Sequence, residues 1–166
     1  EEERATIDAM AEGLSEGDGG AHLKTFHPIG PGFSSIKLHE AAWLDFNMFQ
    51  SSHAARDHDN GLYVEHDYAL IPAKPTLDGE PRYEGIPIGF YNRGAGGLLR
   101  FDDDDVRQAA YWSLLAGACG HTYGHHSVWQ MWAPPRQPVN TPLMPWFEAI
   151  DQPGAGQMQH GRRLVE

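Results

Sequence analysis

The segment from Lys74 to Glu84, KPTLDGEPRYE, concentrates side chains that can act as acids, bases or nucleophiles. An apolar-tending run ends in three carboxylates, an arginine and a tyrosine within seven residues. Parallel barrels present catalytic acids at the carboxyl ends of their strands, just before a loop. Glu80 is therefore the candidate catalytic carboxylate. Asp78 and Glu84 compete with it, and a structural ion pair between Glu80 and Arg82 is the alternative to a catalytic role.

In a strand that continues to Glu80, side-chain alternation would place Asp78 and Glu80 on the same face. Asp78 would then be near enough to orient the catalytic group.

Histidines follow several of the predicted strands. His27 ends the first, His53 follows the second, and His121, His125 and His126 cluster at the fourth, among 10 histidines in 166 residues. A metal site is one interpretation, but neither HExxH nor CxxC spacing occurs. We favour histidines that hydrogen-bond sugar hydroxyls or orient carboxylates, and ordinary structural histidines in loops remain an alternative.

Aromatic and amide side chains near the same strand ends could bind a sugar. Aromatic rings can stack on the apolar face of a sugar ring, and amides can exchange hydrogen bonds with hydroxyls. The candidate amides are Asn47 and Gln50. The candidate aromatic residues are Tyr83, Tyr123, Trp129 and Trp132.

Alternating helical and extended patterns run along the chain, which is typical of βα units on a parallel sheet. Four strands are half of a (β/α)8 barrel, which needs roughly 250 residues, and a small open α/β sheet is the alternative. The expected helices cover residues 2–15, 60–70, 102–116 and 142–150. The expected strands cover residues 22–27, 43–50, 74–79 and 121–124, with helical periodicity also fitting 43–50. A Gly- and Pro-rich loop covers 81–97, and a Gly- and Gln-rich tail ends the chain.

The charge and composition exclude several classes of function. There are 12 Lys and Arg against 23 Asp and Glu, so the formal net charge is −11. Such a chain is poorly suited to nucleic acid or an anionic membrane. The single cysteine excludes an intrachain disulfide, and no apolar run approaches the roughly 20 residues of a membrane span. The acidic run Asp102–Asp105 suits a helix N-terminus better than a calcium loop.

Several segments together resemble the apiosidase-like glycoside hydrolases of family 140, and the resemblance covers nearly the whole chain. They are TFHP at 25–28, SS at 34–35, WLDFNMFQS at 43–51, KPTLDGEPRYE at 74–84, DVRQAAYW at 105–112 and HTYG at 121–124. The resemblance implies a (β/α)8 catalytic barrel that hydrolyses glycosidic bonds in plant cell-wall polysaccharide, with apiose-containing pectin side chains as the characterised substrate class. It also implies a secreted or periplasmic protein.

The resemblance further implies one catalytic carboxylate after barrel strand four and one after strand seven. Glu80 matches the strand-seven position, as the nucleophile. We therefore expect residues 1–166 to form the C-terminal half, strands 5–8, of a TIM-type barrel. The strand-four acid would lie before Glu1, and the chain alone would be inactive. No metal or cofactor is expected.

The resemblance assigns the remaining candidates to a sugar subsite. These are His27, Asn47, Gln50, His53, Tyr83, Tyr123, His125 and Trp129. The expected partners are a carbohydrate substrate and the missing N-terminal half, or a second copy bound through open sheet edges. A non-catalytic carbohydrate-binding module is the runner-up, and a metal-dependent hydrolase built on the histidines is a third possibility.

Overall fold

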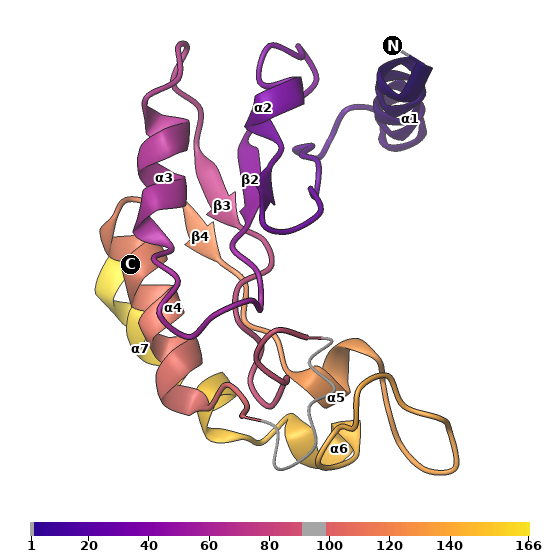
Figure 1. Ribbon diagram of the computed structural model, residues 1–166. Helices are drawn as coiled ribbons and strands as arrows, with labels where there is room; N and C mark the ends of the chain where they lie inside the picture. Colours follow the sequence, from indigo (N-terminus) through magenta and orange to yellow (C-terminus); the bar gives the residue numbers. More distant parts are fainter. Residues whose placement is uncertain (1, 91–98) are drawn as a thin grey trace.

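The computed structural model describes residues 2–90 and 99–166. Part of the loop expected at 81–97 lies outside these residues. The described chain has an α/β architecture, as expected, and Figure 1 shows the path of its elements. The elements are α1 (Glu2–Asp18), β1 (Gly32–Phe33), α2 (Ser35–Leu38), β2 (Asn47–Gln50), α3 (Gly61–Tyr68), β3 (Thr76–Asp78), α4 (Asp103–Leu115), β4 (Gly120–His121), α5 (His126–Trp129), α6 (Trp146–Ala149) and α7 (Pro153–Val165).

One sheet organises the described chain, in the order β1-β2-β3-β4. Strands β2, β3 and β4 are parallel, with Phe49 opposite Asp78 and Asp78 opposite His121. Strand β1 runs antiparallel to β2. The sheet is therefore mixed rather than wholly parallel, because β1, which lies outside the expected strands, is antiparallel to β2. Because neighbouring parallel strands end at the same edge, the segments that follow β2, β3 and β4 converge there.

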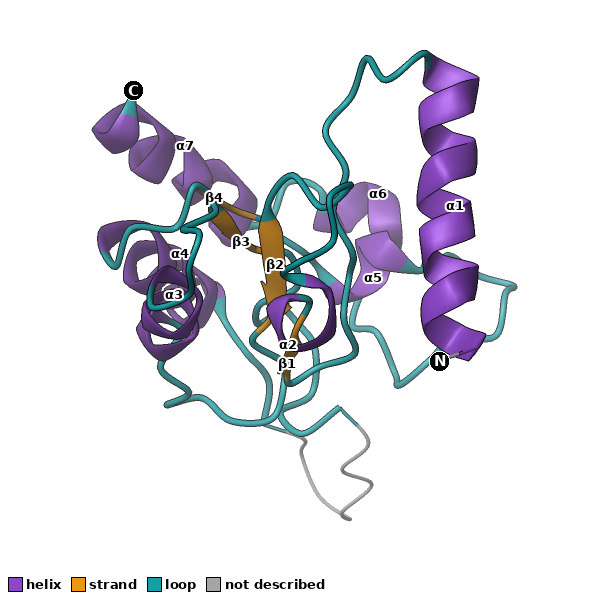
Figure 2. Cartoon of the chain, turned by 90° about the horizontal axis from the view of Figure 1, so that it is seen from above, coloured by secondary structure: helices purple, strands orange, loops and turns teal. Residues whose placement is uncertain are grey.

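The two faces of the sheet have different surroundings. Asn47 and Phe49 in β2, and Thr76 and Asp78 in β3, are buried, whereas the residues between them are partly exposed. Phe49 packs against Tyr63, Val64 and Ala118 beneath α3. Helices α3, α4 and α7 lie together on this side of the sheet, and α1 lies on the other side (Figures 1 and 2).

The segment 22–27, expected to be the first strand, forms no strand. It runs beside residues 45–46, where Asp45 N donates to Lys24 O over 2.9 Å and Thr25 Oγ1 donates to Phe46 O over 2.7 Å. Lys24 N is bound by the carboxylate of Asp45. A strand requires a continuous ladder of backbone hydrogen bonds, and side chains of Thr25 and Asp45 replace that ladder here.

The helices follow local sequence signals more closely than the strands do. The expected helices at 2–15, 60–70 and 102–116 are confirmed as α1, α3 and α4. Helix α4 begins with a capping box in which Asp102 and Asp105 each accept the other's backbone N–H. The Gly- and Gln-rich tail is helical: Pro153–Val165 forms α7, which begins with proline in its first turn and packs against α4.

No helix in the described part of the chain is long and apolar enough to cross a membrane.

Candidate active site

Glu80 stands just beyond the carboxyl end of β3, where two imidazoles contact its carboxylate. His53 Nε2 lies 2.9 Å from Glu80 Oε1, and His27 Nε2 lies 3.2 Å from Oε2. The Glu80 side chain is 24% exposed, whereas His53 is 9% and His27 45% exposed. The carboxylate is therefore held at both oxygens by groups from two other segments, and still reaches solvent.

The ring of His53 has a defined orientation. It lies 4.7 Å from the ring of Tyr83 and 6.1 Å from that of Phe90, measured between centroids. Its backbone oxygen accepts a hydrogen bond from Gly89 N over 2.7 Å. The buried Nδ1 atom has no hydrogen-bond partner among residues 2–90 and 99–166. In the tautomer that carries its proton on Nε2, this atom donates to the Glu80 carboxylate and the unpartnered Nδ1 is an acceptor without a hydrogen. This tautomer suits the site best, because the other one would bury an unpartnered N–H and direct a lone pair at the carboxylate.

His27 faces acceptors with both ring nitrogens. Its Nδ1 lies 2.8 Å from the backbone oxygen of Pro28, while Nε2 faces Glu80. The ring is therefore held between the backbone oxygen of Pro28 and the carboxylate of Glu80.

A pocket of about 600 Å³ opens beside Glu80. This volume suits a small ligand. The pocket brings together five of the residues predicted from the sequence: Gln50, His53, Glu80, Tyr83 and Trp129. Ile29, Gly30, Ser52, Ala54, Ile86, Gly89 and Phe90 complete the lining. We call this cavity the Glu80 pocket.

Three polar groups in the Glu80 pocket have no hydrogen-bond partner within the described residues: the amide of Gln50 and the hydroxyls of Ser52 and Tyr83. Burial raises the pKa of Tyr83 above its usual range, and the charge of Glu80 adds to this effect. The phenol therefore stays neutral and can donate a hydrogen bond. Such groups are suited to binding ligand hydroxyls.

Four of the predicted sugar-subsite residues are not in the lining of the Glu80 pocket, and one of them is His27, although it contacts Glu80. Asn47 is fully buried on the helical side of the sheet and contacts His39 at 3.3 Å. Tyr123 donates to Glu84 Oε2 over 2.6 Å. His125 caps α5 by accepting from Ser127 N over 3.0 Å. Asn47 is the first residue of β2, whereas Tyr123 and His125 lie beyond the end of β4, so the three side chains do not meet at the edge where Glu80 lies.

Asp78 lies in a separate buried network. Its carboxylate accepts hydrogen bonds from Ser51 Oγ, Asn60 Nδ2 and Ser113 Oγ, beneath the helices. Strand β3 ends at Asp78, so the alternation does not continue to Glu80. The two carboxylates therefore face different surroundings, and the expectation that they share a face was wrong.

Arg82 does not pair with Glu80. Its side chain is 1% exposed, and its guanidinium lies 5.5 Å from the ring centre of Trp112. The acceptors of its hydrogen bonds are Arg56 O, His58 O, Asn60 Oδ1 and Gln108 Oε1. Arg82 instead joins the loop at 56–60 to α4, which leaves Glu80 to the two histidines.

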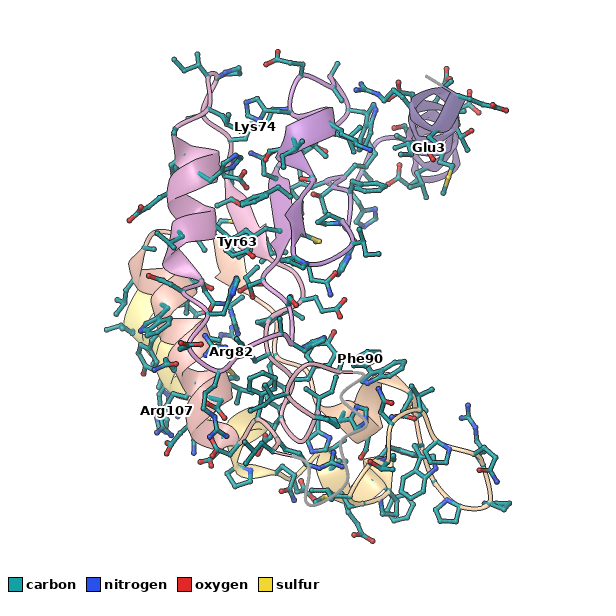
Figure 3. The ribbon with its side chains drawn as sticks, viewed as in Figure 1. Glu3, Tyr63, Lys74, Arg82, Phe90 and Arg107 are labelled. Atoms are coloured by element: carbon teal, nitrogen blue, oxygen red, sulfur yellow. The ribbon has the colours of Figure 1, made fainter. Side chains whose placement is uncertain are left out.

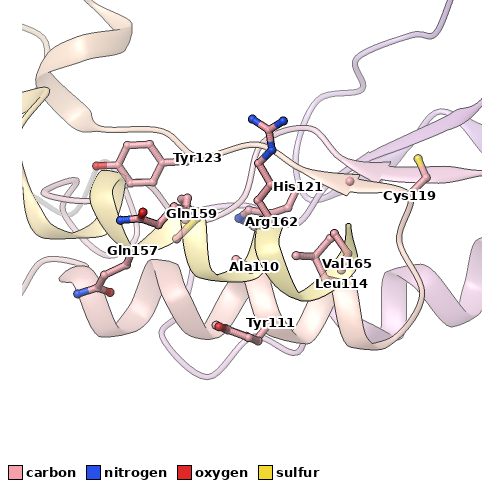
Figure 4. A pocket seen from close by; sticks show the side chains of 13 residues that line it. Ala110, Tyr111, Leu114, Cys119, His121, Tyr123, Gln157, Gln159, Arg162 and Val165 are labelled. Carbon is pink, nitrogen blue, oxygen red and sulfur yellow. The ribbon is translucent and has the colours of Figure 1, made fainter.

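A second pocket, of about 510 Å³, lies along β4 between α4 and α7 (Figure 4). Its side chains include Cys119, His121 and Arg162. Burial lowers the pKa of His121 to about 4. No carboxylate lines the described part of this pocket, so it lacks the acid that glycoside hydrolysis requires.

The sequence did not indicate Ser52 and Phe90 as lining residues. Both have left-handed backbone, with φ of 86° and 50°, although neither is glycine. Such conformations are costly and cluster at functional sites, but no local sequence pattern marks them. Among the described residues, no group of three or more His, Cys, Asp or Glu is arranged to hold a metal ion.

Comparison with known proteins agrees with the resemblance seen in the sequence. The family model described as "Apiosidase-like, catalytic domain" matches residues 1–166. A search of curated proteins found no match.

Two solved structures are similar to the chain. One, named "Glycoside hydrolase", is 40% identical with a TM-score of 0.82, covering 87% of this chain and 35% of that protein. Another, described as a glycoside hydrolase family 5 from Bacteroides vulgatus ATCC 8482, is 36% identical with a TM-score of 0.86, covering 95% of this chain and 37% of that protein. The chain thus spans about a third of the length of these structures.

Proposed function

The chain belongs to the apiosidase-like catalytic domain family, and from that membership we propose that it carries the nucleophile of a glycoside hydrolase, Glu80. The observation that supports this most strongly is the carboxylate held by His27 and His53 at the edge of the Glu80 pocket. A nucleophile must be ionised, oriented and accessible. The two imidazoles orient the carboxylate, and the pocket provides access.

We propose that residues 1–166 are the C-terminal half of a (β/α)8 barrel. Strands β2, β3 and β4 would be strands six to eight, and residues 22–27 would occupy the place of strand five. The parallel arrangement of these three strands and the coverage of only 35% and 37% of the similar structures support this. In an intact barrel, residues 22–27 would gain a neighbouring strand and with it the missing ladder.

The chemistry requires a second carboxyl group, which we place after strand four, outside these 166 residues. Glu80 attacks the anomeric carbon, and a bond forms to its carboxylate oxygen as the glycosidic bond breaks. The second group protonates the departing oxygen and then removes a proton from the water that releases the sugar. His27 and His53 orient Glu80, while Gln50 and Tyr83 bind sugar hydroxyls.

The substrate we propose is an apiose-containing side chain of plant pectin, and the parent protein would be secreted or periplasmic. The chain alone would be inactive. Strand β4 lies at one end of the sheet order. It and residues 22–27 would pair with the rest of the barrel, because unpaired edges otherwise favour association.

Substitution of Glu80 tests the proposal in the full-length protein. Glu80→Gln should lower kcat for an apiose-containing oligosaccharide by at least about 1,000-fold, because a carboxamide cannot form the covalent intermediate. Glu84→Gln is the matched control, since its amide oxygen can still accept from Tyr123. Equal activity of Glu80→Gln and wild type would remove Glu80 from the mechanism, and binding without any turnover by wild type would favour a binding module.

A further inference from the structure

The loop that follows α5, residues 131–141, has strained backbone at both of its ends. Met131 at its start and Asn140 and Thr141 at its end have φ values of 47°, 47° and 39°. None of them is glycine, so this left-handed backbone is unfavourable. Strain of this kind persists only where surrounding contacts impose it.

Side-chain hydrogen bonds hold both ends of the 131–141 loop. The Gln130 amide donates to Val139 O over 3.2 Å, and its oxygen accepts from Val139 N over 2.9 Å. Arg100 donates to the backbone oxygen of Thr141 over 2.7 Å and to its hydroxyl over 3.0 Å. These contacts fix where the chain leaves and rejoins the region around α5.

His126 connects the end of the 131–141 loop, at Asn140, to Trp129. The ring is fully buried, and its Nε2 lies 2.6 Å from Asn140 O, while Nδ1 accepts from Trp129 Nε1 over 3.3 Å. Burial lowers the pKa of His126, so the neutral ring with Nε2–H matches both partners. Asn140 Nδ2 in turn donates to Phe90 O over 2.7 Å, and Figure 3 shows Phe90 on the side of α5.

Trp129 and Phe90 both line the Glu80 pocket. The Trp129 side chain remains 45% exposed although its indole N–H is bound. An indole that is fixed at its polar edge and open on its face is suited to stack on an apolar ring face. Gln50 and Tyr83, with unpaired polar groups in the same pocket, suit the hydroxyls of such a ligand.

We propose that His126 and Asn140 are positioning residues: their contacts fix the plane of Trp129, the aromatic residue that the family resemblance places at the sugar subsite, against the Glu80 pocket. This inference rests on the proposed function for the class of ligand. The strained 131–141 loop would then hold Trp129 against the Glu80 pocket. Because Nδ1 of His126 contacts Trp129 and Nε2 contacts Asn140, substitutions that replace one nitrogen at a time can test the two contacts separately.

Binding is measured by titration calorimetry with an apiose-containing pectin oligosaccharide and the full-length Glu80→Gln protein, which prevents turnover. Trp129→Ala should weaken the dissociation constant about tenfold, since the stacking surface is lost. His126→Gln, which removes the acceptor for the indole N–H, should also weaken it about tenfold. His126→Asn retains a carboxamide oxygen near the position of Nδ1 and should stay within about threefold of the parent.

Trp132→Ala is the matched control. The Trp132 indole donates to Arg136 O, and Trp132 does not line the Glu80 pocket, so binding should stay within twofold. With Glu80 intact, His126→Gln should raise KM about tenfold and leave kcat within twofold, because stacking stabilises substrate and transition state alike. A general loss of structure would lower both.

The inference would be overturned by dissociation constants within twofold of the parent in both Trp129→Ala and His126→Gln, or by the absence of any binding to the Glu80→Gln protein. Because Trp129 is exposed on its face, its substitution remains informative even where buried His126 variants fold poorly. Failure of the proposed function would be seen separately, as wild-type turnover in Glu80→Gln. The stacking contact could then still be measured by KM.

Discussion

Replacement of Asp78 by asparagine should stabilise the protein at neutral pH. The Asp78 side chain is fully buried, and burial raises its pKa to about 6 from the usual 3.8. Oδ2 accepts from Ser51, Asn60 and Ser113 at 2.8–3.0 Å, whereas the contact of Oδ1 with Ser51 Oγ is longer, at 3.3 Å. An asparagine with its carboxamide oxygen at the position of Oδ2 would keep these hydrogen bonds and remove the buried charge.

The sign and size of the effect follow from proton linkage. Between pH 3.8 and about 6, folded Asp78 binds a proton that the unfolded chain has released, so its contribution to stability falls as pH rises. Above pH 6 the cost is complete and amounts to about 3 kcal/mol, from the 1.36 kcal/mol that corresponds to each pH unit. The Asp78→Asn protein would carry no such cost. The stability difference between variant and wild type should therefore grow by about 3 kcal/mol from pH 4 to pH 8.

Urea unfolding of the full-length protein, followed by circular dichroism at intervals between pH 4 and pH 8, measures this difference. Ser113→Ala is an informative companion, since it removes a donor that lowers the pKa of Asp78. It should retain the pH dependence and shift it upward. A difference between Asp78→Asn and wild type that stays constant across the range would refute the reasoning, because no buried carboxylate would then be titrating.

Two further predictions concern the backbone at Ser52 and the cap at His125. Ser52→Gly should raise the free energy of unfolding by about 1 kcal/mol because φ is 86°; Ser52→Ala, which keeps the Cβ atom, should show no such gain in thermal denaturation. Burial lowers the pKa of His125 to about 4, so as pH falls from 6.5 to 4 protonation favours the unfolded chain and stability drops by about 3 kcal/mol. His125→Asn can keep a cap on Ser127 N without titrating, and an acid-unfolding curve as steep as that of wild type would contradict this account.

Local signals in the sequence predicted the helices that carry their own caps and stops. Helix α4 follows from the acidic run at Asp102–Asp105, where two carboxylates form the capping box. The strands were harder to predict because they contain only two to four residues and depend on partners. Residues 22–27 were expected to form a strand that ends before Pro28, but pairing decides whether a ladder forms.

The chemistry of the candidate site was predictable where it depended on residue type near a strand end. Parallel strands β2 and β3 end at the same edge of the sheet, and three of the predicted residues lie at or just after these ends: Gln50, His53 and Glu80. Their side chains therefore line the same pocket. Asn47 begins β2 and is buried beneath the helices, and His125 caps α5 beyond the end of β4, and neither placement follows from residue type alone. The role of Ser52 depends on left-handed backbone, which serine does not signal.

Covalent trapping tests most directly whether Glu80 is the nucleophile. The full-length protein is incubated with an activated aryl apioside fluorinated beside the anomeric carbon, which slows release of the glycosyl-enzyme, and its peptides are analysed by mass spectrometry. We predict one fluorosugar on the peptide that contains Glu80, located on its carboxylate and absent from Glu80→Gln. A label on Asp78 or Glu84, or no label on a protein that still hydrolyses the unfluorinated apioside, would contradict the account.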